Sequence, residues 1–450
     1  MTPLNVVNEQ NPRQIAARIL SQRLNNGEFT ENLLETALAT ARLSPADRGL
    51  CHELVCGVVR WQATLDCLIA RKTTPGREPR PALVNLLRLG LYQIFWLDRI
   101  PPHAAVHETV EQAKRSGYVS QSGFINAILR AYLREFDEVK KILADMKISQ
   151  PALGWSHPEW LVERWRKNYG VEKTLQLLEW NNTPPKTFGR VNTLKTDAAK
   201  LIERWREENV EYDFVRRDFL GELGRADLPV SQTDFENLAF ELKSHPPLNS
   251  LGSFRAGGFY IQDPSTLLAP TLLDAQPGET ILDLCAAPGG KTTFIAQQMN
   301  NEGKIIAHDS FADRLKLIRE NCTRLGVTCA DPTATFNFQP ATFDRVLVDA
   351  PCSNTGVMRR RVDLRWLIQP TEIERLRATQ LILLKQAATV LKPGGVIVYS
   401  TCSLEPEENS EVVKEFLAAN PNFKLESERQ LLPFADKVDG AYVARLKLSN

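Results

Sequence analysis

The sequence predicts a multidomain protein with three parts: an all-α N-terminal domain, a small α+β middle unit and a C-terminal α/β doubly wound domain of the Rossmann-like type. Three observations lead to this prediction. The chain has 450 residues, more than one ordinary hydrophobic core accommodates. Apolar residues recur at helical spacing over 11–135, and strand-like and helix-like segments alternate from about residue 253 onward.

The composition is that of a globular protein, with 43% hydrophobic and 24% charged residues and a net charge of +1. A near-neutral total does not by itself indicate a nucleic-acid binder, although it is compatible with a local basic patch. The first residues lack a signal-peptide pattern, and no apolar run approaches the length of a membrane span. We therefore expect a cytoplasmic protein without a membrane segment, whose eight cysteines are mostly reduced.

The first 140 residues read as helix after helix, with breaks near Pro75 and Pro101. This segment includes Cys51, His52 and Cys56, which make a poor ligand set and are expected to pack in a helix. The whole chain has no C-x-x-C pair, so no metal is expected. The predicted first domain is 1–140.

Residues 141–250 are predicted to hold a linker, at about 140–155, followed by a small α+β unit. A helix is expected after Pro158, a strand near 188–191 and a second helix over roughly 197–208.

The third domain, 251–450, alternates strands and helices. Strands are expected at 280–284, 304–309, 345–348 and 396–400, and alternation in the tail predicts a last strand at the sheet edge. Helices are expected after the first strand, over 315–325, and over 373–391. Such alternation is typical of a parallel sheet covered by helices on both faces, in which ligands bind beyond the carboxyl ends of the strands.

A glycine-rich turn follows the first of these strands. The phosphate-binding loop of nucleotide triphosphatases requires Gly five residues before the Gly290-Lys291 pair, and that position is Cys285. The turn therefore indicates another cofactor. Asp309 ends the next strand, where an acidic residue commonly accepts hydrogen bonds from ribose hydroxyls. A ribose-bearing cofactor that needs no pyrophosphate site fits S-adenosylmethionine. Asp331 is a weaker candidate, because it precedes Pro332 in a loop-like stretch.

Two cysteines, Cys352 and Cys402, follow two further strands and are expected to face the same crevice as the glycine turn. Thiolates are strong nucleophiles toward electrophilic carbons, of which carbon 6 of a pyrimidine is one. Addition there makes carbon 5 nucleophilic enough to take a methyl group. One thiol can attack and the other assist release, and a protonated Asp349 can donate to ring N3. The other cysteines of this domain, Cys322 and Cys329, are expected to be core residues.

A basic cluster follows Cys352 directly. Charge runs are usually solvated faces, but this one lies beside the proposed site and is predicted to grip RNA phosphates. Its members are Arg359, Arg360, Arg361 and Arg365.

These motifs closely resemble the RNA 5-methylcytosine methyltransferases of the NOL1/NOP2/Sun family. The residues that carry the resemblance are 283–292, 349–353 and 401–403, with 258–265 upstream. The helical segment resembles the NusB-like RNA-binding domain through 18–20, 60–61, 89–93 and 124–130. The resemblance covers nearly the whole chain and implies methylation of carbon 5 of a cytosine in 16S rRNA, the expected RNA partner.

The resemblance also implies roles for individual residues. Cys402 would be the nucleophile, Cys352 would assist product release, and the helical domain and the middle unit would position the rRNA. The residues implied to line the S-adenosylmethionine site are Cys285, Ala286, Ala287, Pro288, Gly289, Gly290, Lys291, Asp309, Asp331 and Asp349. The chain departs from the family at Asn354, which usually is Gly or Ala, and at Val362, which usually is Pro. Both departures concern the loop expected to face RNA.

Two alternatives stay open from the sequence. The same chemistry could act on tRNA or another rRNA site, or the chain could be a non-catalytic RNA-binding assembly factor. Retention of both thiols favours the enzyme, because a binding module needs neither. A monomer is the default expectation for the quaternary state.

Overall fold

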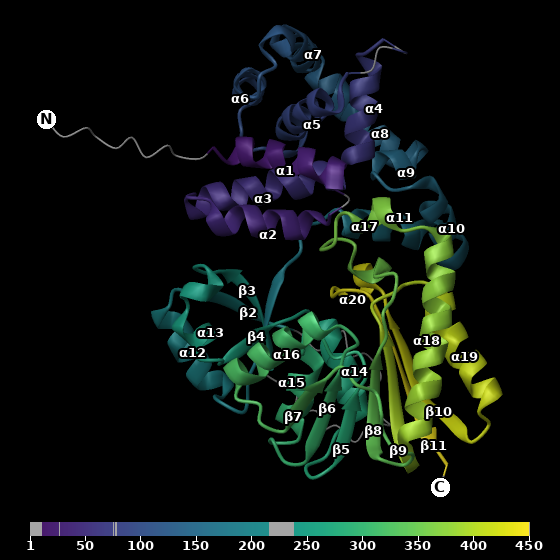
Figure 1. Cartoon of the computed structure of the whole chain (residues 1–450). Helices are drawn as coiled ribbons and strands as arrows, with labels where there is room; N and C mark the ends of the chain where they lie inside the picture. Colours follow the sequence, from purple (N-terminus) through teal and green to yellow (C-terminus); the bar gives the residue numbers. More distant parts are fainter. Residues whose placement is uncertain (1–10, 27, 75, 77–78, 216–237, 450) are drawn as a thin grey trace, which may run out of the picture. The chain divides into compact units, whose positions relative to one another are not determined.

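The computed structural model describes residues 11–26, 28–74, 76, 79–215 and 238–449 (Figure 1). The chain forms two compact units, one of Met1–Thr183 with Met358–Leu367 and one of Pro184–Val357 with Ile368–Asn450. These units differ from the three predicted parts, because helices beyond residue 140 belong to the first unit. Residues 140–155, predicted to include a linker, lie instead in helices.

The first unit is all-helical, as predicted for its N-terminal part. Its core is built from residues at helical spacing, such as Leu83, Leu86 and Leu87, each at most 5% exposed. Its helices are α1 Pro12–Asn26, α2 Thr30–Thr40, α3 Pro45–Arg60, α4 Gln62–Arg71, α5 Pro81–Trp96, α6 Pro102–Arg115, α7 Ser122–Arg134, α8 Phe136–Ser149, α9 Pro151–Gly154, α10 Glu159–Tyr169, α11 Val171–Asn181 and α17 Leu364–Leu367.

The segment Met358–Leu367 folds into this helical unit although it is remote in sequence. Asp363 accepts hydrogen bonds from the backbone N–H and the hydroxyl of Thr30, at 2.6 and 2.8 Å, and pairs with Arg23. Val362 is buried in the core of the helical unit. The departure at Val362 is therefore accommodated by packing in this core.

The second unit contains a small antiparallel sheet of order β2-β3-β1-β4. Trp205, which has no exposed surface, packs edge-on against Phe240 and Phe259 in its core. The elements of this α+β part are β1 Thr187–Val191, α12 Ala198–Glu207, β2 Glu211–Phe214, β3 Ala239–Ser244, α13 Gly252–Arg255 and β4 Phe259–Ile261.

A seven-stranded sheet of order β10-β11-β9-β8-β5-β6-β7 forms the rest of the second unit. Strands β5 to β9 run parallel, and β10 and β11 are antiparallel to their neighbours. The elements are α14 Leu268–Leu273, β5 Thr280–Asp283, α15 Gly290–Gln298, β6 Lys304–His308, α16 Ala312–Leu325, β7 Ala330–Thr333, β8 Phe343–Asp349, α18 Pro370–Val390, β9 Leu391–Thr401, α19 Ser410–Ala419, β10 Phe423–Leu431, α20 Pro433–Asp436 and β11 Ala441–Leu448.

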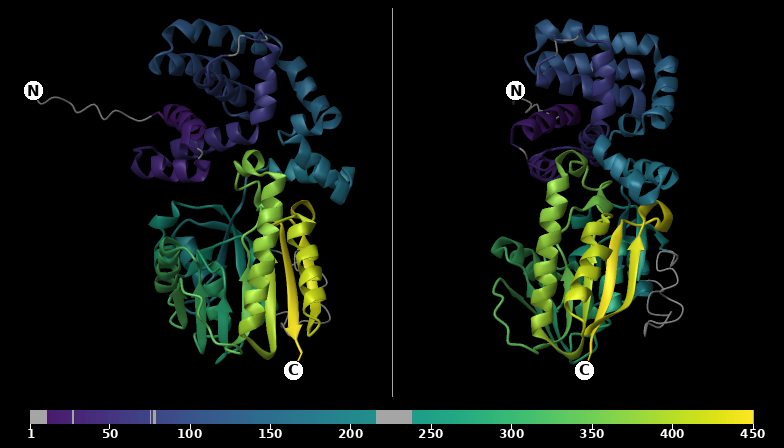
Figure 2. Two further views of the ribbon diagram at one scale, coloured as in Figure 1. Left: turned by 45° about the vertical axis from the view of Figure 1, so that its right-hand side comes forward. Right: turned by 90° about the vertical axis from the view of Figure 1, so that its right-hand side faces the viewer.

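Helices cover both faces of this sheet (Figure 2). Alternate residues of one strand join different cores: Ile281 packs with α14, α15 and α16, whereas Leu282 packs with α18 and α19. The predicted doubly wound fold is thus confirmed. The tail strand β11 is an interior strand between β9 and β10, so the prediction of an edge strand there is wrong, because β10 forms the edge.

Candidate active site

The two predicted thiols lie side by side. Strands β8 and β9 are parallel neighbours in which Asp349 pairs with Ser400, so the chain brings Cys352 and Cys402 together just beyond the strand ends. Their sulfur atoms are 3.3 Å apart, and both cysteines are free thiols. Cys352 is 8% exposed, whereas Cys402 is half-buried and more open to a ligand.

The surroundings of the two thiols differ. The hydrogen bond with Cys402, together with burial, raises the pKa of the Cys352 thiol well above its ordinary value. Cys352 therefore stays protonated at neutral pH. Cys402 lies near the ammonium of Lys291, close enough that the charge of its thiolate form contributes to raising the pKa of Lys291. Its greater exposure and the nearby ammonium favour Cys402 as the nucleophile.

The buried carboxylate of Glu408 forms hydrogen bonds with both loops that carry the cysteines. Glu408 accepts hydrogen bonds from the backbone N–H of Ser353 at 2.8 Å, from the Ser353 hydroxyl and from the Ser403 hydroxyl at 2.5 Å. Burial raises the pKa of Glu408, although these donors act in the opposite direction. Sequence reasoning missed this residue. The repeated Cys-Ser pairs at 352–353 and 402–403 were the available signal, because each serine follows a thiol.

Asp349 is held by two donors at the end of β8. Lys291 Nζ lies 2.5 Å from one carboxylate oxygen, and the Ser400 hydroxyl donates to the other at 2.8 Å. Burial alone would lower the pKa of Lys291, but the Asp349 carboxylate outweighs it and the pKa is raised. Lys291 therefore stays protonated. Asp349 thus has Lys291 and Ser400 as partners, and its predicted role as the proton donor to ring N3 stays a prediction.

The glycine turn links β5 to α15 as predicted. Gly289 has a φ of 100°, a left-handed conformation that favours glycine, and it precedes the first residue of α15. The Ala286 N–H donates to the carbonyl of His308, which holds the turn against the end of β6. Burial raises the pKa of Cys285, so its thiol stays neutral within the turn. The rest of the predicted cofactor set in this segment, Ala286, Ala287, Pro288, Gly290 and Lys291, lies in the turn or opens α15.

Asp309 lies directly after β6 and beside the glycine turn. Its carboxylate accepts from the N–H groups of Ala287 and Phe311, at 3.3 and 3.2 Å, and lies 3.3 Å from Arg314. The side chain is 3% exposed, and the Phe311 ring two residues on is 64% exposed. An acidic group at a strand end beside a turn of small residues suits a ribose hydroxyl pair, so these residues fit the expected cofactor.

Asp331 lies elsewhere. It belongs to the edge strand β7, is exposed, and its carboxylate is 3.6 Å from the ammonium of Lys304. Lys304 begins β6, whereas Asp309 follows the other end of that strand. Asp331 stays a predicted contact of the cofactor.

The small sheet contributes a buried arginine that sequence reasoning missed. Arg190 of β1 is 1% exposed, and its guanidinium donates to the carbonyl of Gly290 at 2.8 Å, to Gln262 at 3.0 Å and to Thr293 at 3.0 Å. Burial lowers the pKa of Arg190 to about 9, so it stays charged at neutral pH. Arg190 therefore anchors the start of α15 from outside the large sheet.

We expect Arg190→Met to weaken cofactor binding by about tenfold, because the start of α15 loses a charged anchor of several hydrogen bonds. Titration calorimetry of the full chain with S-adenosylmethionine measures this. Arg255→Met, at an exposed arginine of the same unit, is the matched control and should bind as the wild type does. An unchanged affinity in Arg190→Met would show that the anchor does not hold the cofactor site.

The stability of the protein is expected to depend on pH through Asp283, at the end of β5. It has no exposed surface, its Oδ2 accepts from Thr292 at 2.6 Å and its Oδ1 lacks a hydrogen-bond partner among the described residues. Burial raises its pKa from 3.8 to about 7. The folded state therefore keeps a proton that the unfolded state releases, and stability is lost as the pH rises from about 4 through about 7.

Asp283→Asn removes this titration. The melting temperature of the variant relative to the wild type is expected to rise between pH 4 and pH 8, by the equivalent of up to about 4 kcal/mol. Melting curves at four pH values measure it, and Asp313→Asn, at an exposed position of α16, serves as the control. A difference that does not vary with pH would contradict the assigned protonation.

Two of the four predicted RNA-binding arginines are buried inside the helical unit. Arg365 has no exposed surface and donates to the carbonyls of Arg60, Ser156 and Asn181 and to the side chain of Asn182. Arg359, 2% exposed, lies over the Trp180 ring at 4.3 Å. These two guanidinium groups have no surface to offer a phosphate, so their prediction as RNA contacts is wrong. Arg360 is half-buried and Arg361 is exposed, and both stay predicted contacts.

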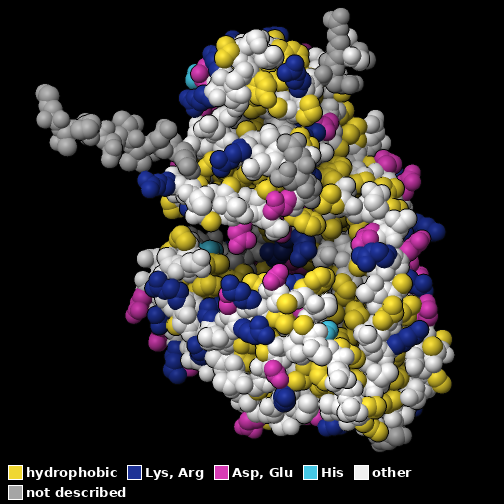
Figure 3. Space-filling model, in the orientation of Figure 1, with side chains coloured by type: hydrophobic (Ala, Val, Ile, Leu, Met, Phe, Trp, Pro, Cys, Tyr) yellow, Lys and Arg dark blue, Asp and Glu magenta, His cyan; other side chains and the backbone are white. Residues whose placement is uncertain are grey.

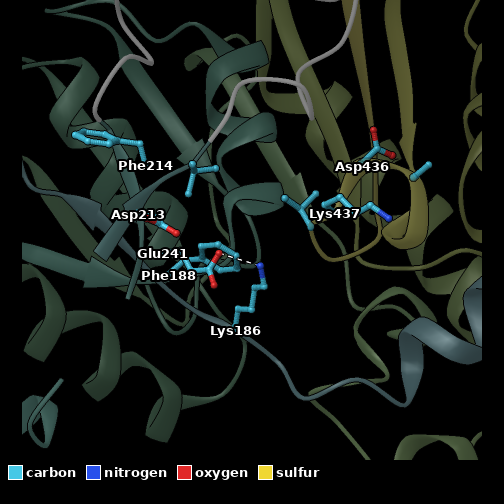
Figure 4. Close-up of a pocket in the computed structure, with 10 residues that line it drawn as sticks. Lys186, Phe188, Asp213, Phe214, Glu241, Asp436 and Lys437 are labelled. Carbon is cyan, nitrogen blue, oxygen red and sulfur yellow. Dashed lines mark hydrogen bonds and ion pairs between the residues drawn. The ribbon is translucent and has the colours of Figure 1, made fainter. Parts of the chain in front are cut away.

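The surface carries no dominant charge on the face drawn in Figure 3, where Lys and Arg are interspersed with Asp and Glu. A cavity of about 610 Å3 lies between the small sheet and the turn after α20 (Figure 4). Lys186 on its wall is bonded to Glu241 at 2.9 Å. None of the predicted site residues lines this cavity, so it is separate from the thiols.

Within the described residues, no helix is long and apolar enough to cross a membrane. The same residues contain no cluster of His, Cys, Asp and Glu side chains suited to a metal ion.

A doubly wound sheet that carries a glycine turn and an acidic residue at adjacent strand ends fits the class of S-adenosylmethionine-dependent methyltransferases. Residues 270–447 match the family model described as 16S rRNA methyltransferase RsmB/F. Residues 10–134 match the NusB family, and 157–217 match the ferredoxin-like domain of the RsmF/B-like methyltransferases. The chain belongs to the RsmB/F family, and it is an S-adenosylmethionine-dependent rRNA methyltransferase.

Similar proteins extend over nearly the whole chain. A probable ribosomal RNA small subunit methyltransferase B of Bacillus subtilis is 35% identical over 92% of this chain and 89% of its own length. One of Synechocystis is 36% identical over 97% of this chain and 99% of its own length. The crystal structure of PH0851 aligns with a TM-score of 0.75, 24% identity, and coverage of 97% of this chain and 98% of its own. The resemblance to this family and the three-part fold are thereby confirmed.

Proposed function

We propose that this chain methylates carbon 5 of a cytosine in 16S rRNA through a covalent adduct with Cys402. The observation that carries the proposal is the pair of sulfur atoms, 3.3 Å apart, at the ends of β8 and β9 beside the glycine turn. Methylation of a nucleophilic amine or hydroxyl needs no thiol, whereas carbon 5 of cytosine becomes nucleophilic only after addition at carbon 6.

In the proposed reaction, Cys402 adds to the base and is expelled again after methyl transfer. The Cys402 thiolate forms a bond to carbon 6, and the displaced electron pair moves into the ring, where N3 takes a proton. Carbon 5 would then take the methyl group that bound S-adenosylmethionine supplies, with cleavage of the bond between that methyl group and the cofactor's sulfur. The carbon 5 proton leaves to solvent, the pair of that C–H bond restores the double bond and expels Cys402 as a thiolate, and N3 gives its proton back. Cys352, a neutral thiol beside that sulfur, is placed to donate a hydrogen bond to the departing thiolate.

Lys291 is the proposed source of the proton that N3 takes. It is paired with Asp349, which the sequence suggested for this role, and it stays protonated. Its ammonium also stabilises the Cys402 thiolate before attack. One residue of the glycine turn thus serves both thiolate formation and ring protonation.

The glycine turn 285–291 and Asp309 would hold S-adenosylmethionine, with Arg190 anchoring the start of α15 behind them. When bound, this cofactor supplies an electrophilic methyl group on a sulfonium centre. The target base must be unpaired or extruded to reach the thiols, because ring atoms inside a duplex are inaccessible. We propose that the helical unit and Arg360 and Arg361 hold the surrounding RNA.

The proposal of 16S rRNA as the substrate is supported by the family match and by relatives named small subunit methyltransferases. Release of tritium from 5-tritiated cytosine in small-subunit rRNA tests both the atom and the substrate. Tritium release equal to methyl incorporation is expected, and Cys402→Ala is the control that should show neither. Methyl incorporation without tritium release would contradict the carbon 5 assignment, and activity on tRNA alone would replace the substrate.

A further inference from the structure

Asn354 bridges the two thiol-bearing loops through its side-chain amide. Its Nδ2 donates to the backbone carbonyl of Cys352 at 2.7 Å, and its Oδ1 lies 3.0 Å from the sulfur of Cys402. A carbonyl oxygen only accepts, so the amide NH2 must face Cys352 and the amide oxygen must face Cys402. The contact with Cys402 is therefore one in which the thiol S–H donates.

The backbone holds this amide in place. Asn354 has a φ of 58°, a left-handed conformation that asparagine tolerates better than other side chains do. Two residues on, the Gly356 N–H donates to the carbonyl of Cys402 at 2.9 Å, and a Cβ at Gly356 would lie 2.8 Å from that oxygen. The loop after Cys352 is thus fixed against the loop of Cys402 by backbone contacts, which leaves the amide little freedom to turn away.

We propose that Asn354 is a positioning residue that holds Cys402 as a thiol before RNA binds and so controls when Cys402 becomes the nucleophile. A hydrogen bond that only the neutral form can donate favours that form over the thiolate. The inference rests on the proposed function, because it concerns the residue that attacks the base. It assigns a role to a side chain that belongs neither to the predicted cofactor site nor to the thiol pair.

Other groups around Cys402 either oppose the effect of the Asn354 amide or influence Cys402 through a neighbouring residue. The Lys291 ammonium favours the thiolate, and the Cys352 S–H, 3.3 Å away, can donate to it. Asp349 partly offsets Lys291 through their ion pair, and Glu408 faces Cys352 from the adjoining loop. Cys402 is therefore placed between a group that retains its proton and groups that accept its charge. Displacement of the amide by an incoming base would shift the balance to the thiolate.

Two substitutions separate this role from a merely structural one, because they shift the same quantity in opposite directions. Asn354→Gly keeps the left-handed backbone and removes the acceptor, so alkylation of Cys402 by iodoacetamide at pH 7 is expected to become about tenfold faster. Asn354→Asp keeps an acceptor and adds a negative charge, so alkylation is expected to slow, with its pH profile moved to higher pH. Mass spectrometry of peptides from the full chain resolves Cys402 from the other cysteines.

The matched control is Asn300→Gly, at an exposed asparagine with a left-handed φ of 52°, which should leave the alkylation profile unchanged. An unchanged profile in Asn354→Gly, or a shift in the same direction in both Asn354 variants, would overturn the inference. The measurement needs neither RNA nor methyl transfer. Full activity of Cys402→Ala would therefore contradict the proposed function without altering this result, and the two failures are distinguishable.

Discussion

Replacing Cys402 with alanine is expected to abolish methyl transfer, with a loss of at least about a thousandfold, because no other group at this site can add to carbon 6 of the base. The neighbouring thiol does not substitute for it. Cys352 is nearly buried, and its pKa is raised well above the ordinary value by the hydrogen bond with Cys402 and by burial. Incorporation of labelled methyl groups into small-subunit rRNA measures the loss.

The control for this prediction is Cys322→Ala, which removes a buried thiol of α16 that packs in the core of the large sheet. It should keep methyl transfer at a wild-type pH optimum even if the protein melts at a lower temperature. Cofactor binding by Cys402→Ala should also persist, since the glycine turn and Asp309 are unchanged. Substantial residual activity in Cys402→Ala would contradict its assignment as the nucleophile.

Replacing Cys352 with alanine is expected to do the opposite and accumulate protein that is covalently joined to RNA. Attack by Cys402 does not need the second thiol, but expulsion of Cys402 loses the hydrogen bond that its neighbour donates across 3.3 Å. The adduct should survive a denaturing gel as a band of reduced mobility when Cys352→Ala protein is mixed with S-adenosylmethionine and unmodified small-subunit rRNA.

The double variant Cys352→Ala/Cys402→Ala should show no such band, because it lacks the attacking sulfur. A band that persists in the double variant would place the covalent bond on another residue. Wild-type turnover by Cys352→Ala, without any accumulated adduct, would remove Cys352 from the release step.

The fold of the second unit was predictable because its pattern is periodic. Strands alternate with amphipathic helices, and that alternation has few three-dimensional solutions. The edge of the sheet was predicted at the wrong strand. Alternation of residues identifies β11 as a strand, but it does not show that β10, whose burial pattern is irregular, pairs with β11 and forms the edge. The segment predicted as a linker instead contains helices α8 and α9. The sequence could not show this, because the association of these helices with the preceding ones depends on tertiary packing.

The site was predictable where its residues adjoin strand ends. Cys352, Cys402, Asp309 and the glycine turn each follow a strand of one parallel sheet, and the topology alone brings them together. Contacts between separate elements were not predictable. The charge run after Cys352 gave no sign that Arg365 bonds to four groups of the helical unit, and nothing in the sequence around Asp349 indicated that Lys291 pairs with it.

Small-subunit rRNA carrying 5-fluorocytosine at the target position tests the covalent mechanism most directly. Fluorine cannot leave carbon 5 as a proton does, so the wild-type chain should stop after methyl transfer with Cys402 still bonded to carbon 6. Digestion and mass spectrometry of the complex are expected to find one modified peptide, containing Cys402, with the mass of a methylated fluorocytidine nucleotide. A modified Cys352 peptide, or methylation without any covalent complex, would contradict the account.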